Sequence, residues 1–310
     1  MKQKHLVSLK DYTRADLEEI FDLAARVKAD PRAHAQALSG KSLGMIFEKP
    51  STRTRVSFEV GMFQLGGHAL HLGVDDIQLR RGETVADTAR VLSRYLDGIM
   101  ARVFSHEDLV EMTRYATVPI INGLSDLLHP VQALADYFTL RERRPRLEGL
   151  VLAYVGDGNN MCQALMLAAA KLGVAMRVAT PGGYEPNQLI VKSTIREAQK
   201  LKAPVPVVTA DPMEAVSGAD AVYTDVWTSM GQEAEAESRR QAFQGYTVSA
   251  ELMAAARPDA VFMHCLPAHR GEEVAAEVMD GPQSIVFDQA ENRLHVQKAI
   301  LMLLMGGTAA

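Results

Sequence analysis

The sequence predicts an α/β protein with two doubly wound parallel-sheet domains of similar size. Short apolar runs that suit buried strands alternate with longer stretches whose apolar residues recur at helical spacing. This alternation starts afresh after the charged, proline-containing segment 141–148. Strands that alternate with helices form parallel sheets with both faces covered. A chain of 310 residues is long enough for two such domains, linked by helices.

The first half opens with a predicted helix over residues 13–28, which starts at a capping box formed by Thr13 and Asp16. Later helices are expected to start at Ser51, Thr84 and Ser105, which suit the capping position, and a further helix is expected to follow His129 and Pro130. The predicted strands of this half are residues 43–47, 69–72, 99–103 and 118–121.

The second half repeats the pattern. Its predicted strands are residues 150–155, 174–180, 205–209, 221–226, 260–264 and 284–287. Its predicted helices are residues 160–172, 187–201, a segment from 211 onward and 290–305. Ligands of doubly wound folds bind beyond the carboxyl ends of the strands. The polar motifs of this chain follow predicted strands, so a site is expected there.

Composition narrows the class of protein. A net charge of −5 provides no basic excess to neutralise a nucleic-acid backbone. Two cysteines, Cys162 and Cys265, cannot form a disulfide framework, which fits a reducing compartment. Residues 1–6 are not followed by an apolar signal core, and no run approaches the ~18 apolar residues that span a bilayer. A cytoplasmic protein that binds neither nucleic acid nor membrane is expected.

The stretch 49–55 (KPSTRTR) is the strongest candidate for chemistry. It follows a predicted strand, and Pro50 disfavours helix in the residue before it, so Ser51 is placed to cap the next helix. The first turn of a helix has backbone N–H groups without intrahelical partners, and two guanidiniums and three hydroxyls stand beside them here. Such a turn suits a doubly charged anion such as phosphate. The alternative is a capped helix whose arginines face solvent.

The motif Ser-Thr-Arg-Thr-Arg, followed by Ser-Phe-Glu at 57–59, resembles the carbamoyl-phosphate signature of the aspartate and ornithine carbamoyltransferases. The segment 129–132 (HPVQ) matches the family's His-Pro-x-Gln motif. The resemblance implies that Thr54, Arg102 and His129 contact the carbonyl oxygen of the carbamoyl group, and that Gln132 contacts its amide. Attack on that carbonyl develops negative charge on oxygen, which preplaced donors stabilise.

The turn 156–160 (GDGNN) could be mistaken for a dinucleotide fingerprint, but Met161 occupies the position of the third glycine. In the resembled family this turn places an asparagine, here Asn160, on the amino-acid substrate. Capping of the following helix is the simpler role of Asn160, and the two roles are compatible.

The segment 225–231 (DVWTSMG) resembles the loop that ornithine carbamoyltransferases, and not aspartate carbamoyltransferases, place over the ornithine end. An aspartate at a strand end suits a cationic amino group, and a glycine suits a mobile lid. The only tryptophan, Trp227, is expected to pack in the core. Residues 232–240, rich in Glu and Arg, are interpreted as a solvated face.

The segment 264–267 (HCLP) follows another strand. A lone cysteine there is most often a small buried hydrophobe, and no second ligand pair with zinc-site spacing accompanies the His-Cys pair. The resemblance makes this motif the ornithine signature, with Cys265 and Asp225 around the δ-amino group. The form of residues 268–273 resembles that of biosynthetic bacterial members.

Taken over the span 51–293, the resemblance implies a specific set of site residues. The expected catalytic residues are Arg102, His129, Asp225 and Cys265. The expected carbamoyl-phosphate ligands are Ser51, Thr52, Arg53, Thr54, Arg55, Gln78, Arg102, His129, Gln132, Cys265, Leu266 and Arg293, with Gln78 contributed to a neighbouring subunit. The expected ornithine ligands are Asn160, Asp225, Ser229 and Met230.

The resemblance implies transfer of the carbamoyl group from carbamoyl phosphate to the δ-amino group of L-ornithine, giving L-citrulline and phosphate in arginine biosynthesis. No cofactor and no metal are expected, and the protein is expected to form a homotrimer or multiples of it. Residues 1–143 would bind carbamoyl phosphate, residues 144–290 would bind ornithine, and the helix in 291–310 would return to the first domain. The alternatives are transfer to another amine such as putrescine, a nucleotide-binding α/β protein, and a non-catalytic binding protein.

Overall fold

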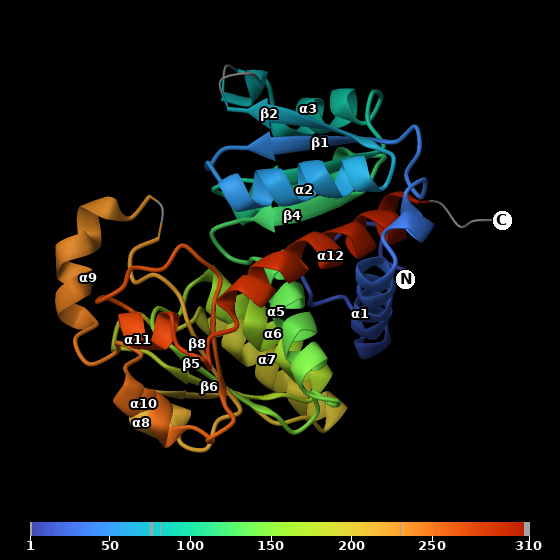
Figure 1. Cartoon of the computed structure of the whole chain (residues 1–310). Coiled ribbons are helices and arrows are strands. Elements are labelled where there is room, and N and C mark those ends of the chain that lie inside the picture. Colours follow the sequence, from blue (N-terminus) through green and yellow to red (C-terminus); the bar gives the residue numbers. More distant parts are fainter. Residues whose placement is uncertain (1, 75–76, 81, 230, 307–310) are drawn as a thin grey trace. The chain divides into compact units, whose positions relative to one another are not determined.

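The computed structural model describes residues 2–74, 77–80, 82–229 and 231–306 (Figure 1). The chain divides into two compact units. The first comprises Met1–Ala135 with Asn292–Ala310, and the second comprises Asp136–Glu291. Two helices, α5 (Pro130–Arg143) and α12 (Val286–Met305), begin in one unit and end in the other.

The first unit contains a parallel sheet with the strand order β2-β1-β3-β4 among the described residues. Its strands are β1 (Ser42–Phe47), β2 (His68–Gly73), β3 (Gly98–Arg102) and β4 (Ile120–Leu124). Its helices, besides the ends of α5 and α12, are α1 (Arg14–Ala29), α2 (Thr52–Gln64), α3 (Val85–Leu92) and α4 (His106–Tyr115). Chain order therefore reverses between β1 and β3, where ligands of this architecture bind.

Helices cover both faces of this sheet. Ala89 of α3 and Leu109 of α4 pack on Ile46 and Ile99 of the strands. Helix α2 lies over the sheet in Figure 1, and α12 joins it through Lys298, whose Nζ donates to Oε1 of Gln64 at 2.9 Å. The arrangement is the expected α/β layering.

Helix α2 carries two apolar stripes, of which only one is buried. Phe58 and Met62 are inaccessible to solvent. Val56, Val60 and Phe63 form the other stripe, and Phe63 is 80% exposed. The helix therefore presents an apolar surface away from the sheet of its own unit.

The second unit contains a parallel sheet with the strand order β7-β6-β5-β8-β9 in the part of the chain that the structure describes. Its strands are β5 (Val151–Val155), β6 (Ala175–Ala179), β7 (Val207–Thr209), β8 (Ala221–Thr224) and β9 (Val261–His264). Its helices are α6 (Asn160–Leu172), α7 (Gln188–Leu201), α8 (Pro212–Val216), α9 (Ala236–Ala242), α10 (Ala250–Ala255) and α11 (Ala276–Met279). Chain order reverses between β5 and β8.

Two layers of helices enclose the second sheet as well. Val216 of α8 and Leu252 of α10 pack with Val222 and Phe262 of the strands in one core. On the other side α5, α6 and α7 lie side by side (Figure 1), and the hydroxyl of Tyr137 donates to the Leu165 carbonyl at 3.0 Å. The predicted fold class is confirmed.

The predicted strand at 284–287 is wrong. Ser284 makes only an isolated bridge to Phe262, and helix α12 begins at Val286 instead of residue 290. Ile285 and Val286 are buried. A short apolar run suits a buried strand and the buried first turn of a helix equally well, and its periodicity does not separate the two.

Candidate active site

In the first unit, residues from several elements meet near the start of helix α2. Strands β1 and β3 pair with Phe47 opposite Arg102, so the turn after β1 lies beside the end of β3. Ser51 caps α2, because its Oγ accepts the N–H of Thr54 at 3.3 Å and donates to Oγ1 of Thr54 at 3.0 Å. Arg293 of α12 donates to the same Oγ1 at 2.8 Å. The end of the chain thus completes the helix start that the sequence predicted as an anion site.

This cluster is basic and buried. Arg102, Arg293, His129 and Gln132 are all nearly inaccessible to solvent. Burial and the neighbouring charges of Arg293 and Arg102 lower the pKa of His129 well below its usual value, so its imidazole is neutral at pH 7. Among the described residues, the buried atoms His129 Nδ1 and Arg53 Nε have no hydrogen-bond partner. Buried polar groups are rarely left so, and a bound anion or carbonyl would provide acceptors.

Three predicted carbamoyl-phosphate ligands of the first unit are exposed and lie outside this buried cluster. Thr52 and Arg55 are exposed on α2, and Arg55 forms an ion pair with Glu59 at 3.4 Å. Gln78 is exposed in a short 3₁₀ turn, Gln78–Arg80. An exposed ion pair is worth little, so Arg55 can exchange Glu59 for an anion at small cost.

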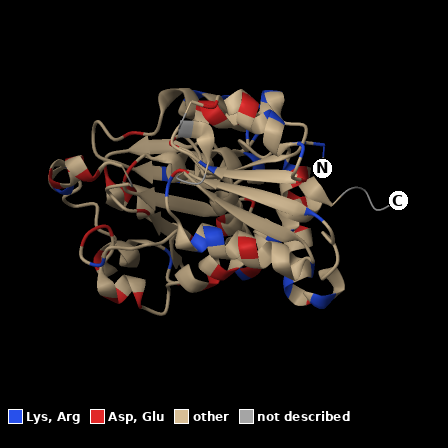
Figure 2. Ribbon diagram, turned by 90° about the horizontal axis from the view of Figure 1, so that it is seen from above, with Lys and Arg blue, Asp and Glu red and all other residues tan. Residues whose placement is uncertain are grey.

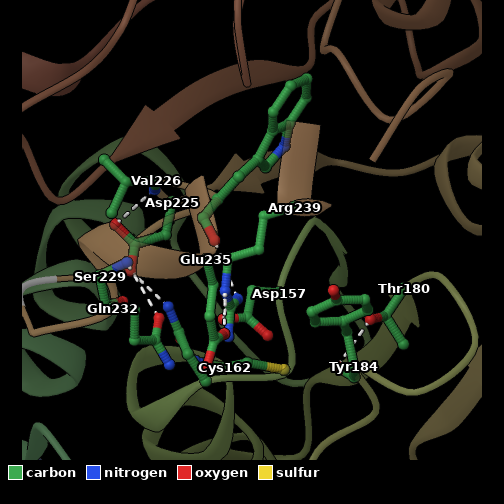
Figure 3. A network of polar contacts seen from close by, with 12 residues as sticks. Asp157, Cys162, Thr180, Tyr184, Asp225, Val226, Ser229, Gln232, Glu235 and Arg239 are labelled. Atoms are coloured by element: carbon green, nitrogen blue, oxygen red, sulfur yellow. Dashed lines mark hydrogen bonds and ion pairs between the residues drawn. The ribbon is translucent and has the colours of Figure 1, made fainter. Parts of the chain in front are cut away.

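In the second unit, the ends of β8 and β9 bring Asp225 and Cys265 together. The strands pair with Thr224 opposite His264, so the next residue of each lies side by side. The thiol of Cys265 donates to Oδ1 of Asp225 at 3.0 Å, and Val226 N–H donates to the same oxygen at 2.8 Å. Figure 3 shows the Asp225 side of this network. The sequence predicted these two side chains to share one site, and they are in contact.

The state of the thiol follows from its surroundings. Burial, reinforced by the charge of Asp225, raises the pKa of Cys265 well above its usual value. Cys265 is therefore a neutral thiol at pH 7 and acts as a hydrogen-bond donor. Asp225 is the acceptor of the pair.

Sequence reasoning missed Asn159. The N-cap of α6 is Asn159, whose Oδ1 accepts the N–H of Met161 at 2.9 Å, while its Nδ2 donates to Oδ2 of Asp225 at 2.8 Å. Asn160, which was expected to combine capping with substrate binding, is the half-buried first residue of the helix and does not cap it. Two adjacent asparagines at a helix start give no sequence signal as to which of them caps.

Steric constraints require glycine at two positions of the turn after β5. Gly156 has φ of 140°, and a Cβ on Gly158 would lie 2.2 Å from the backbone nitrogen of Pro186. Only glycine fits such a conformation and such an approach. The two glycines therefore form a tight turn.

The interpretation of residues 232–240 as a solvated face is wrong for Arg239. Its side chain is buried and donates to Oδ2 of Asp157 at 2.9 Å and to the carbonyl of Trp227 at 3.0 Å (Figure 3). It also lies over the ring of Tyr184, 5.0 Å from its centroid. Burial raises the pKa of Asp157 to about 6, against the opposing effect of Arg239. Arg239 thus ties α9 to the turn after β5, and the polar composition around it hides this contact. Trp227 is buried and stacks on Phe243, as expected.

The donors of Asp225, His264 and Cys265 lie within 4.8 Å of one another, a spacing at which a metal ion could be held. Both ring nitrogens of His264 already have partners. Nδ1 accepts the N–H of Leu266 at 2.8 Å, and Nε2 lies 3.2 Å from Oε1 of Glu273. A metal ion would have to displace one of these contacts.

Comparison with known proteins bears directly on these two sets of residues. Residues 4–142 match the carbamoyl-phosphate-binding domain of the aspartate/ornithine carbamoyltransferases, and residues 148–304 match their Asp/Orn-binding domain. The chain belongs to the aspartate/ornithine carbamoyltransferase family. The resemblance inferred from the motifs is thereby confirmed.

Within this family, the chain is similar to proteins named ornithine carbamoyltransferase. It is 56% identical to the one from Thermococcus kodakarensis, over 98% of this chain and 97% of that protein. It is 59% identical to the one from Symbiobacterium thermophilum, over 98% of this chain and 99% of that protein. The solved structure of ornithine carbamoyltransferase from Pyrococcus furiosus matches with a TM-score of 0.94 and 55% identity, over 98% of this chain and 97% of that one.

Of the remaining predicted ligands, Ser229 and Met230 belong to the loop after β8, and Leu266 belongs to the loop after β9. Ser229 is half-buried, and its N–H donates to Oε1 of Gln232 at 3.1 Å (Figure 3). Met230 lies outside the described residues. Leu266 follows Cys265 and has a left-handed backbone with φ of 61°.

Proposed function

We propose that this carbamoyltransferase converts carbamoyl phosphate and L-ornithine into L-citrulline and phosphate, in the biosynthetic direction of arginine metabolism. The observation that carries the choice of ornithine is the contact of Cys265 with Asp225 at 3.0 Å. A carboxylate beside a neutral thiol suits an amine, and would repel the side-chain carboxylate of aspartate. The relative from Pyrococcus furiosus, 55% identical, is named an anabolic ornithine carbamoyltransferase, which supports this direction.

Carbamoyl phosphate is proposed to bind in the first unit. The phosphate would take the backbone N–H groups and hydroxyls of Ser51, Thr52 and Thr54 at the start of α2. The guanidiniums of Arg53, Arg55 and Arg102 would neutralise the dianion, which lowers the cost of phosphate departure.

The carbamoyl group is proposed to meet the buried part of the same cluster. Neutral His129 would donate to the carbonyl oxygen together with Thr54 and Arg102, and Gln132 would contact the amide. These donors face the oxygen on which negative charge develops during attack. Arg293, hydrogen-bonded to Thr54, would hold this hydroxyl in place and add positive charge.

Ornithine is proposed to bind in the second unit. Its α-amino and α-carboxylate groups would be held by residues of the turn after β5 and of the loop after β8, namely Asn160, Asp225, Ser229 and Met230. Cys265 and Leu266 of the loop after β9 are proposed as further carbamoyl-phosphate ligands on the family resemblance.

The chemical step needs a neutral δ-amino group. The nitrogen lone pair attacks the carbamoyl carbon, the carbon–oxygen bond to phosphate breaks, and the nitrogen loses a proton. The Cys265 thiol is protonated and only donates a hydrogen bond to Asp225. The carboxylate of Asp225 is therefore the group placed to accept the proton of the amine. No cofactor is proposed for this step.

Self-association to a homotrimer, or a multiple of it, is proposed for this chain. Val56, Val60 and Phe63 form an apolar stripe on α2 that is exposed in the single chain, and exposed apolar patches mark interaction sites. Gln78, exposed and outside the buried cluster, would reach the site of a neighbouring copy.

The proposed location is the cytoplasm, where carbamoyl phosphate and ornithine would be the small-molecule partners. Among the described helices, none is long and apolar enough to cross a bilayer. In Figure 2, acidic and basic residues are interspersed along the visible helices, in agreement with the net charge of −5. This mixture of charges supports the expectation that nucleic acid is not a partner.

The proposal is tested by measuring carbamoylation of L-ornithine, putrescine and L-aspartate in parallel, each with carbamoyl phosphate. Selective formation of citrulline is expected. Faster turnover of putrescine would keep the anion site and overturn the assignment of the ornithine ligands. If no acceptor is carbamoylated, the proposed enzymatic activity is wrong and only the proposal of an anion-binding site remains.

A further inference from the structure

The loop after β9 holds a strained backbone next to Cys265. Leu266 has φ of 61°, in the left-handed region that residues with a side chain rarely adopt. Such a conformation persists only where surrounding contacts hold it, and it is typical of functional sites. The contact that holds Leu266 is the hydrogen bond from its N–H to Nδ1 of His264, at 2.8 Å.

This hydrogen bond determines where the proton of His264 lies. An imidazole nitrogen accepts a hydrogen bond only when it carries no proton, so Nδ1 is bare. The proton of the neutral ring is then on Nε2, 3.2 Å from Oε1 of Glu273. His264 and Glu273 both have 0% exposed surface, so water cannot replace either partner.

Glu273 also holds the far end of the loop. The N–H of His269 donates to the same oxygen, Oε1, at 2.5 Å. One carboxylate oxygen thus receives hydrogen bonds from the residues on both sides of the segment 265–268. The side chain of Cys265 leaves this segment toward Asp225.

We propose that Glu273 is a positioning residue for ornithine. Its carboxylate selects the Nε2-protonated form of His264, whose bare Nδ1 holds Leu266, and this backbone keeps the Cys265 thiol on Asp225. Without the carboxylate, the ring could place its proton on Nδ1, where it would face the N–H of Leu266 as a second donor. The inference rests on the proposed function, because that function places the δ-amino group of ornithine at Asp225 and Cys265.

The first test compares Glu273→Met with Glu273→Gln. Glutamine keeps an acceptor oxygen for both hydrogen bonds, whereas methionine fills the space without one. Loss of buried hydrogen bonds predicts a rise of about tenfold or more in the KM for ornithine in Glu273→Met. The KM for carbamoyl phosphate is expected to rise much less, because the phosphate is proposed to bind at the start of α2, whereas this loop belongs to the second unit. Glu273→Gln is expected to restore ornithine use. Glu272→Met, a change in the neighbouring acid that pairs with Arg240, is the matched control.

The second test separates positioning from general stability. In His264→Asn the side-chain oxygen accepts the Leu266 N–H whatever Glu273 does, so adding Glu273→Met is expected to leave the KM for ornithine nearly unchanged. Nitrogen-15 NMR of the His264 ring follows the tautomer without any substrate, and Glu273→Met is expected to remove the pure Nε2-protonated form.

Three results would overturn the inference: an unaltered His264 tautomer in Glu273→Met, an equal rise of both KM values, or a full additional loss in the His264→Asn background. A different result concerns the proposed function. If Asp225→Asn leaves the KM for ornithine unchanged while the tautomer responds to Glu273→Met, then ornithine binds elsewhere and the positioning of the loop by Glu273 stands.

Discussion

The residues beyond the strand ends of the first unit are basic, with Arg102 and Arg293 near a helix start, whereas those of the second unit are acidic, with Asp225 and Asp157. Both sets lie where chain order reverses in a parallel sheet, after β1 and β3 in one unit and after β5 and β8 in the other. The architecture therefore determines where polar side chains converge, and the side chains alone determine which charge is bound.

The two sets also differ in how they are held together. In the first unit, burial and the charges of Arg293 and Arg102 lower the pKa of His129, and the buried His129 Nδ1 has no hydrogen-bond partner among the described residues. In the second, Asp225 receives hydrogen bonds from Cys265, Asn159 and Val226. The first set therefore contains a buried polar atom to which a bound anion or carbonyl would give a partner, whereas Asp225 in the second set already accepts three hydrogen bonds within the chain.

The largest effect is expected from Arg53→Ala. Removal of a cation that neutralises the phosphate should lower kcat/KM for carbamoyl phosphate by roughly 10²–10³, the scale of losing one preorganised charge-stabilising group. The melting temperature should stay close to that of the parent protein, because Arg53 is only half-buried. Steady-state kinetics measures the loss, with Arg114→Ala, an exposed arginine of α4, as the control. Near-normal activity would contradict the proposal that the phosphate binds at the start of α2.

Arg239→Met should next destabilise the second unit. Asp157 would lose its buried partner, and breaking a buried pair from one side costs about 3 kcal/mol. The pKa of Asp157 is already raised to about 6, above the 3.8 of an unfolded aspartate, so the folded state takes up the proton first as pH falls. Without Arg239 the pKa of Asp157 should rise further, so the carboxylate is protonated and uncharged at pH 5. The difference in unfolding free energy between the parent protein and Arg239→Met should therefore be smaller at pH 5 than at pH 7.

Denaturant unfolding at both pH values measures this effect, with Arg240→Met, which is exposed on the same helix, as the matched control. If Arg239→Met lowers the unfolding free energy equally at pH 7 and pH 5, the loss is not caused by the unpaired charge of the Asp157 carboxylate.

Cys265→Ser sharpens the comparison from the ornithine side. The hydroxyl is a shorter donor than the thiol, so its contact with Asp225 should weaken and the KM for ornithine should rise about tenfold, as expected for one hydrogen bond to a charged group. The KM for carbamoyl phosphate should change much less. Steady-state kinetics with each substrate varied in turn checks this, and an equal rise of both constants would contradict a separation of the two binding functions.

The smallest effect is expected from His5→Asn, which lies in neither set. His5 Nδ1 accepts the N–H of Ile120 at 3.1 Å, and burial, with the charge of Lys4, lowers its pKa to about 4. The unfolded chain, with a pKa of 6.5, takes up the proton first, so this contribution is present above pH 6.5 and is lost as pH falls toward 4.

Asparagine keeps an acceptor oxygen but does not titrate. The unfolding free energy of His5→Asn should therefore fall by about 1 kcal/mol less than that of the parent between pH 6.5 and 4, after allowance for partial exposure. Denaturant titrations across this range measure the difference. Parallel curves would show that another group causes the acid sensitivity.

Sequence patterns predicted the elements with strong local signals. The capping box of Thr13 and the cap at Ser51 are present, and the side chains after β8 and β9 meet because parallel register is a regular property of sheets. The predicted strand at 284–287 failed because a short apolar run has no distinguishing period. The burial of Arg239 and Glu273 could not be predicted. Arg239 is buried against Asp157, which is distant in sequence, and both residues stand among polar neighbours that suggest an exposed segment.

The contact of Arg293 with Thr54 has a consequence for the order of synthesis. These residues are 239 positions apart, and all of the second unit is translated between them. A nascent chain can form the sheet of the first unit early, but it has no Arg293 to complete the start of α2. Contacts of such sequence separation are slow to form. The first unit to emerge from the ribosome therefore lacks the Arg293 contact at the start of α2 until the whole second unit has been translated.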